Sequence, residues 1–325
     1  MPIHYSEINS VDVVIKFLDL TDESINLEKL TSLLYEQYII CLISSKDVEN
    51  HYHTGYIGSY TNDTTLINPI HFSDPIVYSL YNIKKFTIQD DLLNQYNKIY
   101  AICMKRWEQD LYTYIDNVHY SHIYDNTIVN YYTIAIIFKQ IIKNVQFLHQ
   151  NNITHMDIAL ENVLYNSYNN RVVLCDFGLS RVVNCNHEIY IGKCGRNQYM
   201  SQEMFEHGKC NMYKNDIFSC GVLLFTMLTG LSLFDTTRSL LCYRKHMSTL
   251  KKFTATILYW KLFIPTPILQ LIYDMIQPER YRLSLSEILS HPFLNATGTH
   301  NEYLRSIKNT VVPDIDNDSK INTDT

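Results

Sequence analysis

The chain has 325 residues, of which 46% are hydrophobic and 18% charged, so it can form two packed lobes or two small domains and is not globally disordered. Its formal net charge is -6 and it has no extended basic run, which argues against a dedicated nucleic-acid-binding protein, because phosphate binding needs clustered Lys and Arg. None of the 8 cysteines forms a Cys-x-x-Cys pair, so a zinc cluster is not expected.

Two segments bear on where the protein is found. The start, MPIHYSEINSVD, lacks the apolar core of a signal peptide, so we expect reduced thiols and an intracellular, cytoplasmic location. Residues 217–234 carry no charge and approach the length of a membrane span. Their Gly, Ser and Thr content and the absence of basic flanks favour a helix buried in a globular core, so no membrane association is expected.

The N-terminal part reads mainly as strands. Residues 10–20 form a β-branched run that is typical of a strand, whereas residues 24–44 repeat apolar positions at helical spacing. A polar, turn-rich stretch follows, with one predicted strand at about 52–60. The sequence KIYAICM, residues 98–104, predicts a further strand.

After residue 107 the pattern becomes mainly helical. Residues 127–150 are apolar on most faces and predict a long buried helix, and residues 213–230 predict a second strong helix. Short strands are expected at about 162–165 and 171–175, and further helices extend to SLSEILSHPFL. The pattern therefore predicts a small strand-rich part followed by a larger helical part.

The stretch from residue 155 to residue 178 contains an ordered set of polar groups. His155-Met156-Asp157 is followed by Asn162 and then by Asp176-Phe177-Gly178. This set resembles the protein kinase family, whose catalytic loop is His-Arg-Asp, four residues and Asn, followed by Asp-Phe-Gly.

The resemblance covers about residues 3–295 and implies an α+β, bilobal, protein-kinase-like fold. The N-lobe would span about 3–104, truncated and strand-rich, with an insertion at about 62–97. The C-lobe would span about 108–295 and be mainly helical. The polar, acidic stretch 309–325 is predicted to be a disordered tail.

The spacing of these groups suits phosphoryl transfer, which is catalysed mostly by positioning and charge neutralisation. Asp157 would take or orient the proton of the attacking hydroxyl group. Asn162 and Asp176 carry the oxygen ligands that Mg²⁺ prefers and would hold it against the phosphates of ATP. Two strands joined by the turn VLYNSYNNR would bring these metal ligands together.

Matches downstream strengthen the resemblance. GRNQYMSQE, residues 195–203, resembles the Gly-Thr-x-x-Tyr-x-Ala-Pro-Glu that closes a kinase activation segment. The resemblance pairs Glu203 with Arg282, and we expect a buried, bidentate, structural pair. It also implies that Asp216, near the start of the second strong helix, braces the backbone of the catalytic loop.

A kinase also needs a strand Lys for the α- and β-phosphates and a helix Glu that holds it. Lys16 in VVIKF resembles the family's Val-Ala-Ile-Lys, and Lys84 or Lys85 is the alternative. Only 19 residues separate Lys84 from Cys103, too few for a helix, a strand and their connections. We therefore favour Lys16, with Glu36 as its partner 20 residues later.

The resemblance also implies nucleotide contacts at Met104 and Asp110, at the end of the KIYAICM strand and in the EQDLYTYI that follows. The same assignment leaves no room before Lys16 for a Gly-rich loop, because PIHYSEI resembles the strand that follows that loop. Loss of its backbone amides would weaken ATP binding and misorient the γ-phosphate.

Other positions depart from the family pattern. Met156 replaces the Arg that normally pairs with a phosphorylated activation loop, so the usual phosphate switch is not expected. Ala159 replaces the Lys of Ser/Thr kinases, and Arg196 stands where they carry Thr. We hypothesise that Arg196 supplies the missing catalytic cation near Asp157; a solvent-facing Arg is the alternative. Ala159 is closer to the Tyr kinase pattern, whereas Glu161 favours Ser/Thr, which is the preference we adopt.

Three functions follow from these patterns. The first is a Mg²⁺-dependent protein kinase that transfers the ATP γ-phosphate to a Ser or Thr of a protein substrate. The second is a pseudokinase that acts as an interaction or scaffold protein, which the lack of a Gly-rich loop favours. The third is a small-molecule phosphotransferase, against which Asp-Phe-Gly, Glu203, Asp216 and Arg282 argue.

Overall fold

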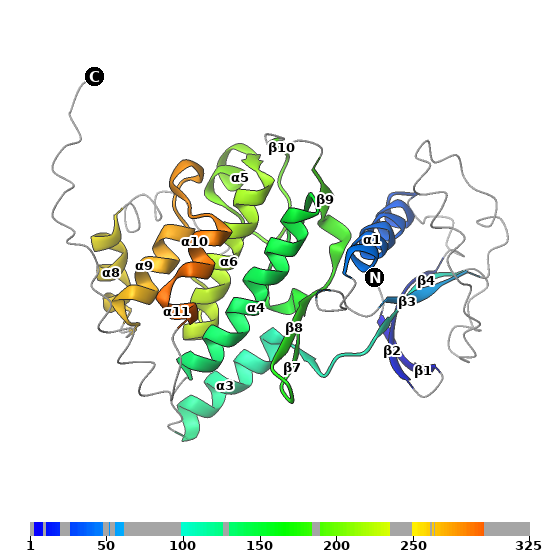
Figure 1. Ribbon diagram of the computed structural model, residues 1–325, viewed down its shortest axis with the longest axis horizontal. Helices are drawn as coiled ribbons and strands as arrows, with labels where there is room; N and C mark the ends of the chain where they lie inside the picture. Colours follow the sequence, from blue (N-terminus) through cyan, green and yellow to red (C-terminus); the bar gives the residue numbers. More distant parts are fainter. Residues whose placement is uncertain are drawn as a thin grey trace. The chain divides into compact units, whose positions relative to one another are not determined.

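Figure 1 presents a computed structural model of the chain. The structure describes residues 3–8, 11–19, 27–47, 52, 56–61, 99–125, 130–183, 189–234, 249–260, 262 and 264–295. The chain divides into two compact units, which are described separately below. The first comprises residues 1–114 and 147–184, and the second comprises residues 115–146 and 185–325.

The first unit contains a four-stranded antiparallel sheet. Its strands are β1 (Ile3–Ile8), β2 (Val11–Asp19), β3 (Tyr56–Thr61) and β4 (Ile99–Lys105). They lie in the order β1-β2-β4-β3, so β2 and β4 are central (Figure 1). The strands predicted at 10–20, about 52–60 and 98–104 are thereby confirmed.

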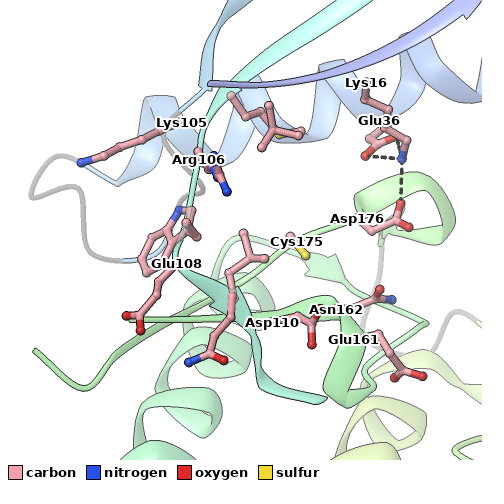
Figure 2. Close-up of a pocket in the computed structure, with 15 residues that line it drawn as sticks. Lys16, Glu36, Lys105, Arg106, Glu108, Asp110, Glu161, Asn162, Cys175 and Asp176 are labelled. Carbon is pink, nitrogen blue, oxygen red and sulfur yellow. Dashed lines mark hydrogen bonds and ion pairs between the residues drawn. The ribbon is translucent and has the colours of Figure 1, made fainter. Parts of the chain in front are cut away.

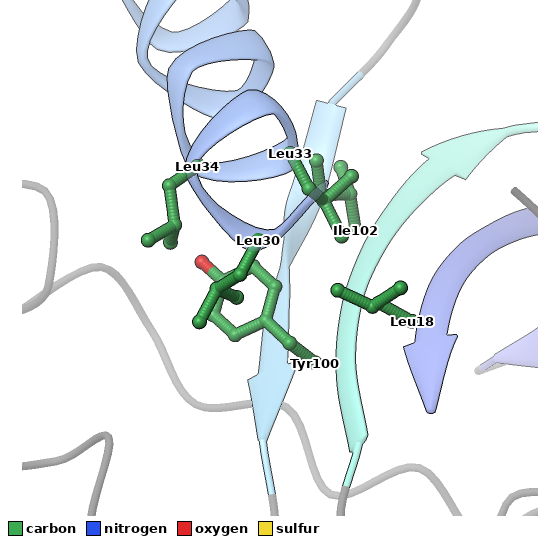
Figure 3. Packing of buried hydrophobic residues seen from close by; sticks show 6 residues of the cluster. All are labelled: Leu18, Leu30, Leu33, Leu34, Tyr100 and Ile102. Atoms are coloured by element: carbon green, nitrogen blue, oxygen red, sulfur yellow. The ribbon is translucent and has the colours of Figure 1, made fainter. Parts of the chain in front are cut away.

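Helix α1 (Leu27–Lys46) packs against this sheet. Leu30, Leu33 and Leu34 recur at helical spacing, so they project from one face of the helix. Figure 3 shows them meeting Leu18 of β2 and Tyr100 and Ile102 of β4 in one buried cluster. The helix predicted at 24–44 is confirmed, and this cluster fixes α1 to β4 and to β2, the strand that carries Lys16.

The rest of the first unit is built from short strands. Strand β5 (Gln109–Asp110) pairs with β7 (Val163–Asn166), which forms an antiparallel hairpin with β8 (Arg171–Leu174). Strand β6 (Ile153–Thr154) pairs with β9 (Arg181–Val182). The 3₁₀ helix η3 (Leu160–Asn162) precedes β7, and η4 (Phe177–Leu179) follows β8. The strands predicted near 162–165 and 171–175 are confirmed.

The helical part begins with α3 (Leu111–Asp125) and α4 (Tyr131–Gln150), which confirms the long helix predicted at 127–150. The second unit then contains helices α5 (Gln202–His207), α6 (Met212–Thr229), α8 (Leu250–Tyr259), α9 (Thr266–Met275), α10 (Leu285–Ser290) and α11 (Pro292–Asn295). It also has the short pair β10 (Ile189–Ile191) and β11 (Lys209–Asn211). The predicted α+β class, with a strand-containing N-terminal region and a mostly helical C-terminal region, is confirmed.

Helix α6 is the core helix of the second unit. Its residues from Asn215 to Phe225 are all buried, as predicted for this uncharged stretch. Gly221 allows α6 to approach α9 closely, because a Cβ at this position would lie 2.9 Å from the Cβ of Met275. Among the helices that the structure describes, none is long and apolar enough to cross a membrane.

The cysteines that the structure describes are thiols and form no disulfide with one another. Cys103, Cys194, Cys210 and Cys220 are buried, whereas Cys41 and Cys175 are half-buried. Burial raises the pKa of Cys103 and Cys210 to about 12 and raises the pKa of Cys175 and Cys220 as well. Cys185, Cys242, Lys84, Lys85, the insertion predicted at about 62–97 and the tail predicted at 309–325 fall in parts of the chain outside the described residues.

Candidate active site

The loop between β6 and β7 carries Asp157 in a fixed position. The amide nitrogen of Asn162 donates at 2.8 Å to both the backbone oxygen and the Oδ2 atom of Asp157. Met156, between His155 and Asp157, is buried and has a φ of +67°, a left-handed conformation that is uncommon for a long side chain. Such backbone strain persists only where the surroundings hold it, and it concentrates at functional sites.

The buried His155 joins this loop to the segment that contains Asp176. Its Nε2 atom lies 3.0 Å from the carbonyl oxygen of Cys175, and its Nδ1 atom accepts from the Asp157 backbone N–H at 3.3 Å. These bonds require that Nε2 carries the proton. The imidazole also packs on Phe177, with ring centroids 5.1 Å apart. The positions of Asp157 and Asp176 are therefore coupled through one side chain.

The β7–β8 hairpin brings the two predicted metal ligands to the same end of the sheet. Val163 pairs with Leu174, and the Cys175 N–H donates to the Asn162 carbonyl oxygen at 2.9 Å. Asn162, just before β7, and Asp176, just after β8, therefore lie at the same end of the hairpin. Asp176 has a φ of +60°, in the left-handed region that Asp tolerates better than most residues. With its nitrogen donating to Asp157, Asn162 would use Oδ1 toward a cation.

Lys16 on β2 reaches two carboxylates (Figure 2). Its Nζ atom lies 2.7 Å from Glu36 Oε2 and 3.0 Å from Glu36 Oε1, and it also donates to Asp176 Oδ1 at 3.0 Å. The side chain of Glu36 is 1% exposed, that of Lys16 is 14% exposed, and that of Asp176 is 48% exposed. The predicted Lys16–Glu36 pair is present in the structure, and Lys16 lies between the buried carboxylate and the exposed one.

The environment keeps Lys16 and Asp176 charged. Burial alone would lower the pKa of the Lys16 ammonium, but the carboxylates of Glu36 and Asp176 outweigh that effect and raise the pKa. Burial would raise the pKa of Asp176, but the Lys16 cation outweighs it and lowers the pKa. Burial raises the pKa of Glu36, and Lys16 offsets this only in part. The site therefore presents one cation and one solvent-facing anion at neutral pH.

These groups line a pocket of about 350 Å³ within the first unit. Its walls include the apolar side chains of Val14, Met104 and Leu164, and its charged end is formed by Lys16, Glu36, Asn162 and Asp176 (Figure 2). The volume lies in the range of about 300–1,000 Å³ that is usual for small-molecule sites. The structure therefore brings six of the predicted residues to one pocket: Lys16, Glu36, Met104, Asp110, Asn162 and Asp176.

Asp110 also has a structural role that the sequence did not reveal. It precedes α3, and its Oδ1 atom accepts from the Thr113 N–H at 2.7 Å, which is the contact of an N-cap residue. Sequence reasoning also missed other residues that line the pocket, among them the consecutive Arg106, Trp107, Glu108 and Gln109. The signal that could have found them is their position between β4 and α3, where the chain borders the pocket.

Arg196 lies in the second unit, whereas Asp157 lies in the first. The Arg196 side chain is half-buried, and its carbonyl oxygen accepts from the backbone N–H groups of Tyr199 and Met200. Its hypothesised role beside Asp157 stays a prediction. Asp216 is buried in α6, and its predicted contact with the catalytic loop also concerns both units and stays a prediction.

The second unit contains the predicted pair of Glu203 and Arg282, with a different geometry. Arg282 Nη2 donates to Glu203 Oε2 at 3.1 Å and lies 2.8 Å from Oε1 as an ion pair, so the same nitrogen contacts both oxygens. The expected bidentate pairing through two nitrogens was wrong, because Nη1 and Nε donate to the carbonyl oxygens of Lys214 and Gln277, at 2.7 and 3.0 Å. The guanidinium therefore fastens three segments of the second unit together.

A family model of the protein kinase domain matches residues 88–294, which is more than half of the chain. The matched range includes Asp157, Asn162 and Asp176, whereas Lys16 and Glu36 lie outside it. The involvement of these last two residues therefore rests on the geometry of the pocket.

Curated relatives agree with this match. The chain is 29% identical over 163 residues to the probable serine/threonine-protein kinase HSL1 of Saccharomyces cerevisiae, an alignment that covers 48% of this chain and 10% of the relative. It is 30% identical over 163 residues to the serine/threonine-protein kinase PLK4 of Drosophila grimshawi, covering 50% of this chain and 20% of the relative. It is 29% identical over 173 residues to the serine/threonine-protein kinase PLK4 of Drosophila persimilis, covering 52% of this chain and 21% of the relative.

These alignments span only a tenth to about a fifth of the length of the relatives, so the similarity concerns the kinase domain and not the whole proteins. Because the family model matches more than half of its residues, this chain belongs to the protein kinase domain family.

Proposed function

We propose that the chain is an active protein kinase that transfers the γ-phosphate of ATP to a Ser or Thr hydroxyl of a protein substrate, with Mg²⁺ as cofactor. The observation that carries the proposal is the contact of Lys16 with both Glu36 and Asp176 in one pocket. We propose that the kinase domain spans about residues 3–295 and that the protein acts inside the cell. We propose Ser/Thr specificity because Glu161 precedes Asn162.

The side chains of the pocket fit ATP and Mg²⁺. The apolar wall of Val14, Met104 and Leu164 suits a flat nucleobase, and the Lys16 ammonium suits phosphate oxygens. Asn162 and Asp176 offer the oxygen ligands that Mg²⁺ binds, and the depressed pKa of Asp176 keeps its carboxylate available. Bound Mg²⁺ would neutralise charge on the phosphates during transfer.

Within this proposal, the residues of the site have distinct tasks. Lys16 binds phosphate oxygens and Glu36 holds the ammonium in place. Asp157 accepts or orients the proton of the substrate hydroxyl, and Asn162 fixes the direction of that carboxylate through its amide nitrogen. Met104 and Asp110 border the part of the pocket where the base and ribose would bind.

The first test is Mg²⁺-dependent binding of ATP, which is detected as a change in the Tm of the purified chain. Ligand present at about 100 times its Kd stabilises a folded protein by about 2.7 kcal/mol, so we expect a Tm rise of a few degrees that requires Mg²⁺. Asp176→Asn and Lys16→Met should abolish the rise, because they remove a metal ligand and the phosphate-binding cation.

Asp116→Asn serves as the matched control, since Asp116 is an exposed residue of α3, and it should behave as the wild type. A Tm that does not change at millimolar ATP and Mg²⁺ would contradict the proposed nucleotide site. It would favour the second candidate, a pseudokinase with a scaffold role.

Arg196 provides a second test. If it supplies a cation to the transferring phosphate near Asp157, Arg196→Ala should lower kcat for peptide phosphorylation while the Kd for ATP changes little. Steady-state kinetics and calorimetry on the same variant measure the two quantities. Equal losses in kcat and in nucleotide affinity, or no loss in either, would contradict a catalytic role of Arg196 beside Asp157.

A further inference from the structure

The face of α1 that carries Glu36 also contacts the segment after Asp176. Ser32, Tyr35 and Glu36 are spaced at i, i+3 and i+4, so they lie on the same side of the helix. A Cβ added to Gly178 would lie 3.8 Å from Glu36 Oε2 and 4.0 Å from Ser32 Oγ, so this side packs directly on Gly178. Contacts between α1 and η4 extend this packing.

Tyr35 continues these contacts beyond Gly178. Its hydroxyl oxygen accepts from the Val182 N–H at 3.3 Å, and the Arg181 guanidinium lies 5.9 Å from the centroid of its ring. Both partners form β9, which pairs on its other edge with β6 through Ile153 and Thr154. Strand β6 leads directly into His155. Tyr35 therefore links α1 to the small sheet that supports the catalytic loop.

Glu36 is adjacent to Tyr35 on the same rigid helix, so the two side chains move together. A rotation or shift of α1 that breaks the contact of Tyr35 with Val182 also displaces the Glu36 carboxylate from Lys16. Because Glu36 is almost fully buried, its carboxylate is unfavourable without that cation. The contact at Tyr35 and the ion pair at Glu36 therefore stabilise the same position of α1.

We infer that Tyr35, through Val182 and Arg181, is a positioning residue that holds α1 where Glu36 orients Lys16 in the nucleotide pocket. We call the three residues the Tyr35 latch. This inference rests on the proposed function, because it assigns Tyr35 to the alignment of that same site. The latch consists of a neutral hydroxyl group, a backbone amide and a cation over a ring, so it needs no phosphorylated residue.

The test compares Tyr35→Phe and Tyr35→Leu with Tyr38→Phe. Tyr38 is on the same helix, is also half-buried, and its ring centroid lies 6.0 Å from that of Tyr35, so it is a matched control for loss of a hydroxyl group. We expect Tyr35→Phe to lower kcat about 3- to 10-fold, as for loss of one hydrogen bond, with a larger loss for Tyr35→Leu. Tyr38→Phe should keep the wild-type kcat.

The KM for the protein substrate should stay unchanged in all three variants, because the latch acts on the nucleotide side. A folded Tyr35→Leu protein with wild-type kcat, or equal losses in Tyr35→Phe and Tyr38→Phe, would overturn the inference. Arg181→Lys keeps the charge but loses the planar stacking, so we expect a smaller loss than for Tyr35→Leu.

Hydrogen exchange of peptides from α1 provides a readout that does not depend on activity. Tyr35→Phe should speed exchange in residues 27–46 while Tyr38→Phe does not, and identical exchange in the two variants would overturn the latch. If the wild-type chain transfers no phosphate, the proposed function fails, yet the exchange comparison still decides whether Tyr35 holds α1. The two failures are therefore distinguishable.

Discussion

Replacement of Asp157 by Asn is expected to lower kcat for protein phosphorylation by about 10²- to 10⁴-fold, the usual contribution of a general base. The change removes the basic oxygen but keeps the shape of the side chain and an oxygen that can accept from Asn162. The hydrogen bond from the Asn162 side-chain nitrogen to the Asp157 carbonyl oxygen also remains. Folding and nucleotide binding should therefore be preserved while the chemical step is lost.

Initial rates with radiolabelled ATP and a generic protein substrate measure this effect, and thermal shift with Mg²⁺ and ATP confirms that the variant still binds nucleotide. The exposed Asp116→Asn variant controls for loss of one negative charge. An Asp157→Asn protein that retained more than about a tenth of the wild-type rate would show that another group handles the proton.

Replacement of Arg282 by Met is expected to destabilise the second unit by about 3–5 kcal/mol, the range measured when one partner of a buried ion pair is removed. The Arg282 side chain is 0% exposed, and its loss leaves the Glu203 carboxylate and the carbonyl oxygens of Lys214 and Gln277 without their donor. Met fills much of the volume, so the loss reflects missing hydrogen bonds rather than a cavity.

Urea unfolding monitored by circular dichroism measures this change as a lower midpoint. Arg280→Met is the matched control, because Arg280 is an exposed neighbour whose guanidinium stacks on Tyr281, and it should cost well under 1 kcal/mol. The double variant with Glu203→Gln should be less destabilised than the sum of the single variants, since the two residues interact directly. Strict additivity would mean that Arg282 acts through its backbone contacts alone.

The resemblance to protein kinases, together with spacing in the sequence, was enough to predict two long-range relations. Lys16 and Glu36 were matched by the room needed for a strand and a helix, and the structure shows them in contact. Asn162 and Asp176 were predicted to meet because two short strands and a turn separate them, and β7 and β8 place them at one end of a hairpin. The resemblance names the residues, and the local periodicity of the strands and the helix is compatible with their meeting, so one sequence is enough to propose them.

The remaining features depend on tertiary contacts that no local pattern encodes. The left-handed backbone of Met156 lies in a loop where the His155 ring bonds both to Cys175 and to Asp157. Arg282 uses three separate donors because carbonyl oxygens from α6 and from the segment after α9 converge on it. Such convergence depends on how the helices pack, which the sequence specifies only through the whole core.

The buried cysteines allow the transient opening of each unit to be measured separately by thiol alkylation. A thiol attacks an alkylating reagent only as the thiolate, and the raised pKa of Cys103 and Cys210 leaves very little thiolate at neutral pH. Labelling of these side chains must therefore wait for a transient opening that exposes them to solvent. Because Cys103 belongs to the first unit and Cys210 to the second, the alkylation rate of each thiol reports the opening free energy of its own unit.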